Sequence, residues 1–207
     1  IIQDLMIQSE KLLRKNVILF DLDMTLVDTS SLLDMRKSGK WKSIYNNFDS
    51  TKIYPGVKDV IKNLQRFYQL AVVTSSPRAY AKKLLQYHDI EIPVVSAYHD
   101  TKKHNPEPDP FLFAIEKLQL DPKKDVIITI GDDINDIIAS NAINHHYGVN
   151  PTHSSNNNFQ ENGFNTYGVP FGEYSKSELH KSGAIWVIDN FSELNILTDG
   201  TKVGRPS

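Results

Sequence analysis

The stretch that decides the fold is FDLDMTLVDT, at residues 20–29. It overlaps a short apolar run, residues 17–20, whose branched side chains and polar flanks predict a buried parallel strand. Asp21 and Asp23 follow that strand directly. Neighbouring carboxylates repel each other, so one takes up a proton unless a cation lies between them. A simple aspartate-rich turn explains this pair equally well, and the rest of the chain must decide.

The composition predicts one globular domain. The chain has 207 residues, of which 40% are hydrophobic and 23% charged, so it can form a core and is not globally disordered. A net charge of -2 implies no general attraction to nucleic acid or to a membrane. The absence of cysteine excludes disulfides, thiolate catalysis and Cys-ligated zinc. No apolar stretch is long enough to span a bilayer and no signal-peptide pattern is present, so the expected location is the cytoplasm.

Alternating strands and helices predict an α/β fold with a doubly wound parallel sheet. Buried strands are predicted at residues 17–20, 69–74, 92–95, 126–130, 167–169 and 185–188. Helices are predicted at residues 1–16, 57–67, 77–87, 111–118, 137–142, 176–182 and 191–197. We expect a single domain over residues 1–207, with its parts as follows: a core at about 15–29 and 53–198, a small helical insert at about 30–52, a polar surface excursion at about 144–163 and a disordered tail at about 199–207.

Polar side chains follow three of the predicted strands. They are Asp21 and Asp23, then Thr74 and Ser75, then Asp132, Asp133 and Asp136. The carboxyl ends of parallel strands meet at one edge of a sheet, so these clusters are expected to form one site. An all-oxygen set of ligands suits Mg²⁺, and hydroxyls beside helix N-termini suit a phosphate group.

These residue types predict phosphate-ester chemistry. Asp21 can attack phosphorus and form an aspartyl-phosphate. Asp23 can protonate the leaving oxygen and then deprotonate the attacking water. The helix after Thr74 offers free backbone N–H groups to the phosphoryl oxygens. The sequence therefore predicts a magnesium-dependent phosphate monoester hydrolase.

From about residue 17 to residue 194 the chain resembles the haloacid dehalogenase-like (HAD) hydrolase superfamily. The motif D-x-D-x-T occurs at residues 21–25, a hydrophobic strand ending in Thr-Ser at 72–75, and G-D-x-x-x-D at 131–136. The order and spacing of all three are far more specific than any one of them. The resemblance implies a phosphatase rather than a dehalogenase, because Asp23 is present. It also implies that Mg²⁺ is held by Asp21, the carbonyl of Asp23 and Asp132, with Asp133 or Asp136 providing a ligand or orienting one through water.

One family motif is altered. The resemblance implies a lysine before P-x-P that contacts the nucleophile and the phosphate, but here Asn105 precedes Pro106. Asparagine can donate hydrogen bonds but has no charge. Three alternatives stay open: Lys102 or Lys103 reaches the site, both are solvated loop lysines, or Asn105 inactivates the chain. The expected phosphate-binding set is Thr74, Ser75, Asn105 and Lys103.

The insert at residues 30–52 is longer than an ordinary connection but short for a full cap domain. We expect Thr29 or Ser30 to cap one helix that continues towards Trp41. Its basic residues, Arg36, Lys37, Lys40 and Lys42, either meet an anionic substrate or form a solvated helix face, and we favour the solvated face. Arg78 either contacts substrate or caps a surface, and we favour the capping role. A small insert predicts an open site that admits small or macromolecular phosphorylated substrates, or that a partner subunit of an oligomer covers.

Two other classes of function fit the same residues. A catalytically weak member of the superfamily would bind a phosphorylated ligand or a protein partner, and Asn105 keeps this hypothesis open. A receiver-like phospho-acceptor domain also uses clustered aspartates and magnesium on a doubly wound sheet. The position of Asp23 and the order of G-D-x-x-x-D argue against a receiver. The fold alone cannot separate these classes.

Overall fold

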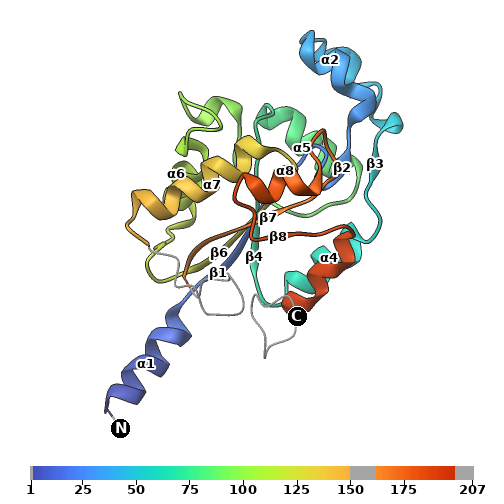
Figure 1. Cartoon of the computed structure of the whole chain (residues 1–207). Helices are drawn as coiled ribbons and strands as arrows, with labels where there is room; N and C mark the ends of the chain where they lie inside the picture. Colours follow the sequence, from blue (N-terminus) through green and yellow to red (C-terminus); the bar gives the residue numbers. More distant parts are fainter. Residues whose placement is uncertain (1, 150–161, 199–207) are drawn as a thin grey trace.

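A computed structural model describes residues 2–149 and 162–198, and Figure 1 shows its arrangement. Its main feature is a six-stranded sheet with the order β5-β4-β1-β6-β7-β8. The strands are β1 (Asn16–Phe20), β4 (Gln69–Val73), β5 (Val94–Ser96), β6 (Val126–Gly131), β7 (Gly163–Gly168) and β8 (Trp186–Val187). Every pairing in this sheet is parallel. The chain extends the sheet first on one side of β1 and then on the other, which confirms the predicted doubly wound fold.

The central strands are buried on both faces. Val17 and Leu19 of β1 contact one hydrophobic cluster, whereas Ile18 and Phe20 contact the other. Successive side chains of a strand point to opposite faces, so a strand covered on both sides needs a continuous apolar run. This requirement explains why all four residues from 17 to 20 are apolar.

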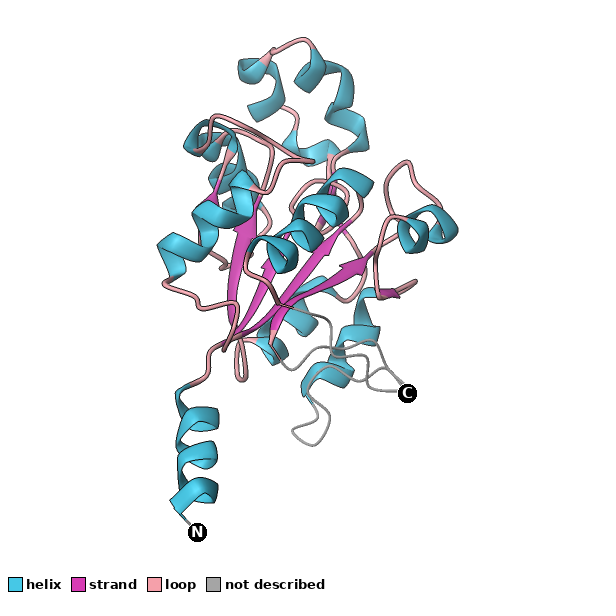
Figure 2. Ribbon diagram, turned by 60° about the vertical axis from the view of Figure 1, so that its left-hand side comes forward, coloured by secondary structure: helices cyan, strands magenta, loops and turns pink. Residues whose placement is uncertain are grey.

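Helices cover both faces of the sheet, as Figure 2 shows. The core helices are α4 (Val57–Leu64), α5 (Arg78–Tyr87), α6 (Asp109–Leu118), α7 (Ile134–His146) and α8 (Lys176–Lys181), with 3₁₀ turns η3 (Tyr98–Asp100) and η4 (Phe191–Thr198), and helix α1 (Ile2–Leu13) precedes β1. Side chains of α4, α5 and η4 pack on one face and those of α6 and α7 on the other. Helix α1 extends away from the sheet (Figure 1). Within the described part of the chain, no helix has both the length and the hydropathy to cross a membrane.

The insert differs from the single helix that the sequence predicts. It contains η1 (Ser30–Leu32), α2 (Leu33–Lys37), α3 (Trp41–Tyr45) and η2 (Phe48–Ser50). Gly39, with φ of +66°, reverses the chain between α2 and α3, a conformation that glycine adopts without strain. The side chain of Thr29 caps no helix and instead donates a hydrogen bond to Asp23. The expected long helix is therefore wrong.

The insert is joined to the core by a short antiparallel ribbon of β2 (Val27–Asp28) and β3 (Lys52–Ile53). Ile44 and Phe48 of the insert are buried in the same cluster that covers the sheet. The insert projects above the sheet in Figure 1 and lies beyond the tips of the strand arrows in Figure 2. It therefore sits over the carboxyl ends of the strands.

Two other boundaries differ from the sequence prediction. Helix α7 continues to His146, and β7 begins at Gly163, four residues before the predicted start at Tyr167. Both ends of the predicted excursion at 144–163 thus belong to regular elements. Residues 150–161 of that excursion and the tail at 199–207 lie outside the described residues.

Buried hydroxyls fix helix α7 against β6 and β7. The Ser140 hydroxyl lies 2.7 Å from that of Thr129 and 2.8 Å from that of Thr166. The Asn144 amide also donates to the Phe164 carbonyl and accepts from the Phe164 N–H, both at 2.9 Å. These bonds matter for the site because α7 begins with the turn that contains Asp136.

Candidate active site

A cleft of about 390 Å³ opens at the carboxyl ends of the central strands. It is bordered by the turn after β1, the insert, the turn after β4, the start of α7 and the loop after β7. Its lining residues are Asp21, Asp23, Met24, Thr29, Ser30, Leu33, Arg36, Thr74, Ser75, Ser76, Asp132, Asp133, Asp136, Gly172, Glu173 and Tyr174. The three clusters that the sequence places at strand ends therefore line one cleft.

Three carboxylates form a group at the base of this cleft. Oxygen atoms of Asp21, Asp132 and Asp136 all lie within 4.8 Å of one another. The Asp21 N–H donates to the Ile130 carbonyl at 2.9 Å and so continues the pairing of β1 with β6. Asp132 accepts a hydrogen bond from the Thr25 hydroxyl at 3.2 Å.

Burial raises the pKa of each of these three carboxyls. The pKa of Asp132 rises to about 6 and that of Asp136 to about 8, and the pKa of Asp21 lies well above its ordinary value. Repulsion among neighbouring carboxylates adds to the effect of burial. A divalent cation would relieve this repulsion, and an all-carboxylate set of oxygens fits Mg²⁺.

Backbone approaches the carboxylate group closely at Gly172. A Cβ at this position would lie 2.0 Å from Asp132 Oδ2, so a side chain here would force the carboxylate or the loop to shift. The loop after β7 therefore fixes one wall of the predicted metal site.

Asp133 and Asp23 do not join the group of three. Asp133 lines the cleft, but its Oδ1 accepts the Asn135 N–H at 2.8 Å and caps helix α7. The Asp23 carboxylate is 8% exposed and has partners of its own. The prediction that its carbonyl contacts magnesium stays a prediction.

Four side-chain donors hold the Asp23 carboxylate. Oδ1 accepts from Thr29 Oγ1 at 2.8 Å and from the Tyr80 hydroxyl at 2.6 Å. Oδ2 accepts from Ser76 Oγ at 2.7 Å and forms an ion pair with Arg36 Nη2 at 3.0 Å. Burial, and then the charge of Asp23, raise the pKa of Tyr80, so its phenol stays a donor. The orientation of Asp23 is thus fixed by the insert and by α5.

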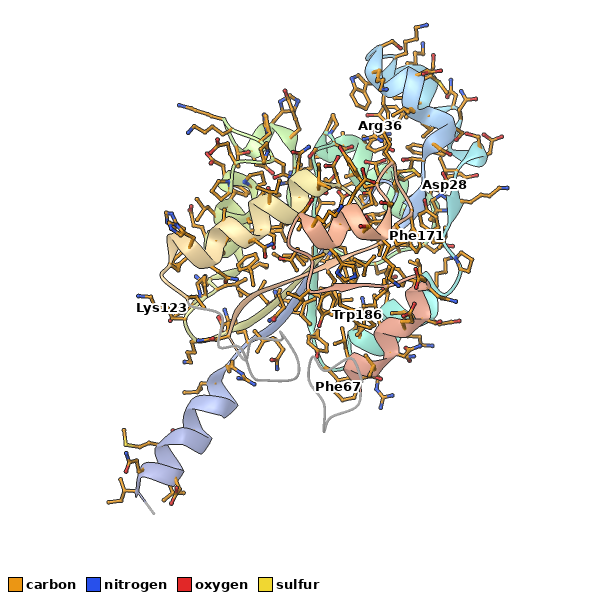
Figure 3. All side chains as sticks on the ribbon, in the orientation of Figure 1. Asp28, Arg36, Phe67, Lys123, Phe171 and Trp186 are labelled. Carbon is orange, nitrogen blue, oxygen red and sulfur yellow. The ribbon has the colours of Figure 1, made fainter. Side chains whose placement is uncertain are left out.

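Arg36 corrects the interpretation of the insert as a solvated basic face. Its side chain is 23% exposed and points from α2 into the cleft. Arg36 also donates to Ser76 Oγ at 2.9 Å and lies 5.5 Å from the centre of the Tyr80 ring. Figure 3 labels Arg36 where the insert approaches the core. Among the described residues that line the cleft, Arg36 is the only one with a positive charge.

The predicted phosphate-binding residues lie in different places. Thr74 is buried in the cleft wall and accepts the Ser76 N–H at 3.1 Å, while Ser75 is exposed to the cleft. The Asn105 amide donates to Asp136, and its Oδ1 is buried without a partner among the described residues. Lys103 is exposed and is not among the residues that line the cleft. The structure therefore does not bring Lys103 to the site.

Arg78 has a structural role, as expected from the sequence. It donates to the Val94 and Val95 carbonyls and pairs with Asp100. These contacts attach the start of α5 to β5 and η3. Arg78 is therefore not among the residues that line the cleft.

The sequence assigned no role to Ser76 or Tyr80, and it gave Thr29 a helix-capping role that the structure does not show. Ser76 follows Thr74-Ser75, so the polar run itself was the signal. Tyr80 gave no signal, because a buried tyrosine at helical spacing is typical of a core residue. Its hydroxyl differs from that of an ordinary core tyrosine because it donates a hydrogen bond to Asp23.

Comparisons with known proteins agree with this fold and site. The model of the family described as haloacid dehalogenase-like hydrolase matches residues 34–149. A phosphoglycolate phosphatase from Psychrobacter arcticus is 38% identical over 99 residues, which cover 45% of this chain and 41% of that protein. The chain thus matches less than half the length of this relative.

Solved structures share the fold over most of the chain. A hydrolase from Pseudomonas syringae superposes with a TM-score of 0.64 at 20% identity and covers 89% of this chain and 98% of its own. CbbY from Rhodobacter sphaeroides, solved in complex with phosphate, superposes with a TM-score of 0.62 at 18% identity, covering 86% and 95%. With more than half of its residues matched by the family model, and with the carboxylates grouped at the carboxyl edge of a doubly wound sheet, this chain belongs to the haloacid dehalogenase-like hydrolase family.

Proposed function

We propose that this chain hydrolyses phosphate monoesters through an aspartyl-phosphate on Asp21. The observation that supports this most is that Asp21 and Asp23, two positions apart in the sequence, have different surroundings in the structure. Asp21 belongs to a group of three carboxylates, whereas Asp23 is surrounded by four donors. The nucleophile must be ionised, so the assignment requires Mg²⁺ to keep Asp21 ionised within its group of carboxylates. Asp23 lies outside that group and is available to exchange a proton with the leaving oxygen and then with water.

The reaction has two steps. In the first, Asp21 attacks phosphorus, the bond to the leaving oxygen breaks, and Asp23 gives its proton to that oxygen. In the second, Asp23 takes a proton from water, the water oxygen attacks phosphorus, and phosphate leaves as the Asp21 carboxylate is restored. Arg36 and the three hydroxyls stabilise the Asp23 carboxylate between these steps.

Magnesium would be held by Asp21, Asp132 and Asp136, where it would supply positive charge to the phosphoryl oxygens. Thr74 and Ser75 line the wall of the cleft where those oxygens would lie. Asn105, hydrogen-bonded to Asp136, orients that carboxylate but adds no charge.

Arg36 is proposed to provide the cation that the family's lysine provides elsewhere. A phosphate dianion that enters a cleft lined by carboxylates needs compensating charge. Asn105 is neutral and Lys103 is exposed outside the cleft, whereas Arg36 reaches into the cleft from the insert. Its planar guanidinium can contact Asp23 and a phosphoryl oxygen at once.

The relative named phosphoglycolate phosphatase supports the same reaction class. The competing function is binding of a phosphorylated ligand without turnover. Both functions need the cleft, but only hydrolysis needs Asp21 as a nucleophile.

The test is hydrolysis of p-nitrophenyl phosphate with Mg²⁺ and with EDTA. We expect turnover that requires Mg²⁺, falls below detection in Asp21→Asn, and persists in Asp28→Asn, which changes a half-buried carboxyl outside the cleft. Trapping of radioactive phosphate on the protein, absent in Asp21→Asn, would identify the covalent intermediate. Turnover that survives in Asp21→Asn would refute the mechanism, and phosphate binding without turnover would support the competing function.

A further inference from the structure

A second cavity adjoins the catalytic cleft. This groove has a volume of about 480 Å³, within the range of small-molecule sites. Its lining residues are Leu33, Arg36, Lys37, Trp41, Ser75, Ser76, Pro77, Tyr98 and His99. Four of them also line the cleft: Leu33, Arg36, Ser75 and Ser76. A substrate with its phosphoryl group at Asp21 would therefore extend its leaving group into the groove.

The groove and the cleft have opposite chemistry. Five aspartates line the cleft, whereas no acidic residue is among the described residues that line the groove. The charged residues of the groove are Arg36 and Lys37. Such a surface does not repel an anionic substrate and favours an electron-rich ring beside its cations.

Aromatic and apolar side chains form the walls of the groove. Trp41 lies on the insert, and Tyr98 and His99 belong to η3 on the core. Leu33 is 38% exposed and Tyr98 is 43% exposed, so both present apolar surface to the groove.

Tyr98 is held in place by its neighbours. Its ring stacks on that of His104 with centroids 4.1 Å apart and an interplanar angle of 14°. The ring of His99 lies edge-on to it at 5.0 Å. A tyrosine that is fixed on one face and exposed elsewhere is a preformed surface for stacking.

We propose that this groove binds the leaving group of the substrate and that it takes a flat aromatic group, as in a nucleoside 5′-monophosphate. This inference rests on the proposed phosphatase function and specifies its substrate class. In such a nucleotide the ribose separates the phosphate from the base, which matches two adjoining cavities. A two-carbon acid, by comparison, would leave the aromatic walls in water.

The test compares adenosine 5′-monophosphate with ribose 5-phosphate. Both are primary esters of the same sugar phosphate, so their main difference at the site is the base. We expect kcat/KM for the nucleotide to be about tenfold higher or more, because stacking of one base on an aromatic side chain has an effect of this size. Tyr98→Ala should bring the ratio towards one, and Tyr98→Phe should keep it.

The control is Phe67→Ala, which removes a ring that is 48% exposed and lies at the opposite end of the molecule from the insert (Figure 3). It should leave the ratio unchanged. Trp41 is a poorer test position, because it packs edge-on against Tyr80, which holds Asp23. Equal kcat/KM for the two substrates in the unmodified chain would overturn the inference and leave the hydrolysis proposal intact.

A binding measurement tests whether the groove binds the base, and it does not require turnover. Calorimetry on Asp21→Asn with Mg²⁺ should show tighter binding of adenosine 5′-monophosphate than of ribose 5-phosphate, and Tyr98→Ala should abolish the difference. Equal affinities would refute the groove proposal. Absence of p-nitrophenyl phosphate turnover would refute the hydrolysis proposal but not the groove proposal. The groove proposal is tested separately by the difference in affinity between the two ligands.

Discussion

At the residue scale, Asp23 has four side-chain donors, and only Arg36 among them is charged. We expect Arg36→Met to lower kcat/KM by about 10- to 100-fold, the usual effect of losing a charge-assisted hydrogen bond. Arg36→Lys should retain part of the activity. If Arg36 supplies the charge that Asn105 lacks, Asn105→Lys should recover part of the activity of Arg36→Met. Steady-state kinetics of the two single variants and the double variant measure this coupling.

The dependence on the leaving group separates two roles of Arg36. The comparison uses kcat/KM, which covers only the steps up to release of the leaving group and so excludes the later role of Asp23 as a base. A residue that acted only by stabilising Asp23 would change kcat/KM little for p-nitrophenyl phosphate, whose leaving group needs no proton, and much for alkyl phosphates. A residue that binds the phosphate affects both substrates and also weakens inhibition by inorganic phosphate. Loss confined to alkyl phosphates would refute the proposed role of Arg36 in phosphate binding.

Gly172 is predicted to be essential for magnesium affinity. In Gly172→Ala the new methyl group would lie 2.0 Å from Asp132 Oδ2, so the carboxylate is expected to rotate away from its position beside Asp21 and Asp136. We expect the Mg²⁺ concentration for half-maximal activity to rise by about tenfold or more, since displacing a ligand weakens a metal site. The melting temperature in EDTA serves as the control and should change little. Unchanged magnesium affinity would show that the close approach of Gly172 to Asp132 does not determine the metal site.

At the element scale, the hydroxyls of Thr129, Ser140 and Thr166 connect α7 to two strands. Ser140→Ala removes the middle hydroxyl and leaves two buried groups with fewer partners. We expect the free energy of unfolding to fall by about 1–3 kcal/mol, measured by urea denaturation. Ser182→Ala is the control, because Ser182 is an exposed hydroxyl on the end of α8. Equal effects of the two substitutions would contradict this role of the hydroxyls.

The regular elements were largely predictable because their patterns are local. Strand β6 is buried at all six positions and reads as one apolar run. The prediction of one helix for the insert failed for two reasons. Gly39 reverses the chain within it, and Ile44 and Phe48 pack into the core rather than along a continuous helix face. The positions of Ile44 and Phe48 are set by contacts with the core, so they do not follow the spacing of one helix face.

At the scale of the whole molecule, the carboxylate group should make stability depend on pH and on magnesium together. The pKa values of Asp132 and Asp136 in the folded chain, about 6 and about 8, exceed the ordinary 3.8. At pH values above about 4, Asp132 and Asp136 therefore keep protons in the folded chain that they have lost in the unfolded chain. This contribution to stability is present in full below about pH 4 and is lost as pH rises towards 8.

Magnesium should reverse this loss, because it favours the ionised carboxylates. We expect the increase in melting temperature caused by Mg²⁺ to be small at pH 5 and to grow up to pH 8. Calorimetry at several pH values measures the melting temperature with Mg²⁺ and with EDTA. Subtracting the two values at each pH removes the contribution of groups that titrate far from the site. Asp136→Asn should weaken the pH dependence. A magnesium effect that does not vary with pH would contradict the assignment of the metal site.

The site was predictable only where the sequence places its residues beside strand ends. Asp21, Thr74 and Asp132 each follow a strand, so the sheet topology brings them together. The partners of Asp23 did not follow from any spacing, because Ser76 and Tyr80 lie 53 and 57 residues away along the chain. Such contacts depend on how α5 and the insert pack, which is a property of the whole molecule.

The ribbon of β2 and β3 has a consequence for protein engineering. Its two strands pair Val27 with Ile53 and Asp28 with Lys52, so the insert leaves and re-enters the core through neighbouring residues. Segments of other lengths can be transplanted between these junctions with little added loop-closure entropy. If the proposed function holds, a graft that keeps Thr29, an arginine facing Asp23 and apolar residues in place of Ile44 and Phe48 is expected to retain hydrolysis and to change which leaving group is preferred. The ribbon is therefore the natural exchange point for redesigning what this enzyme accepts.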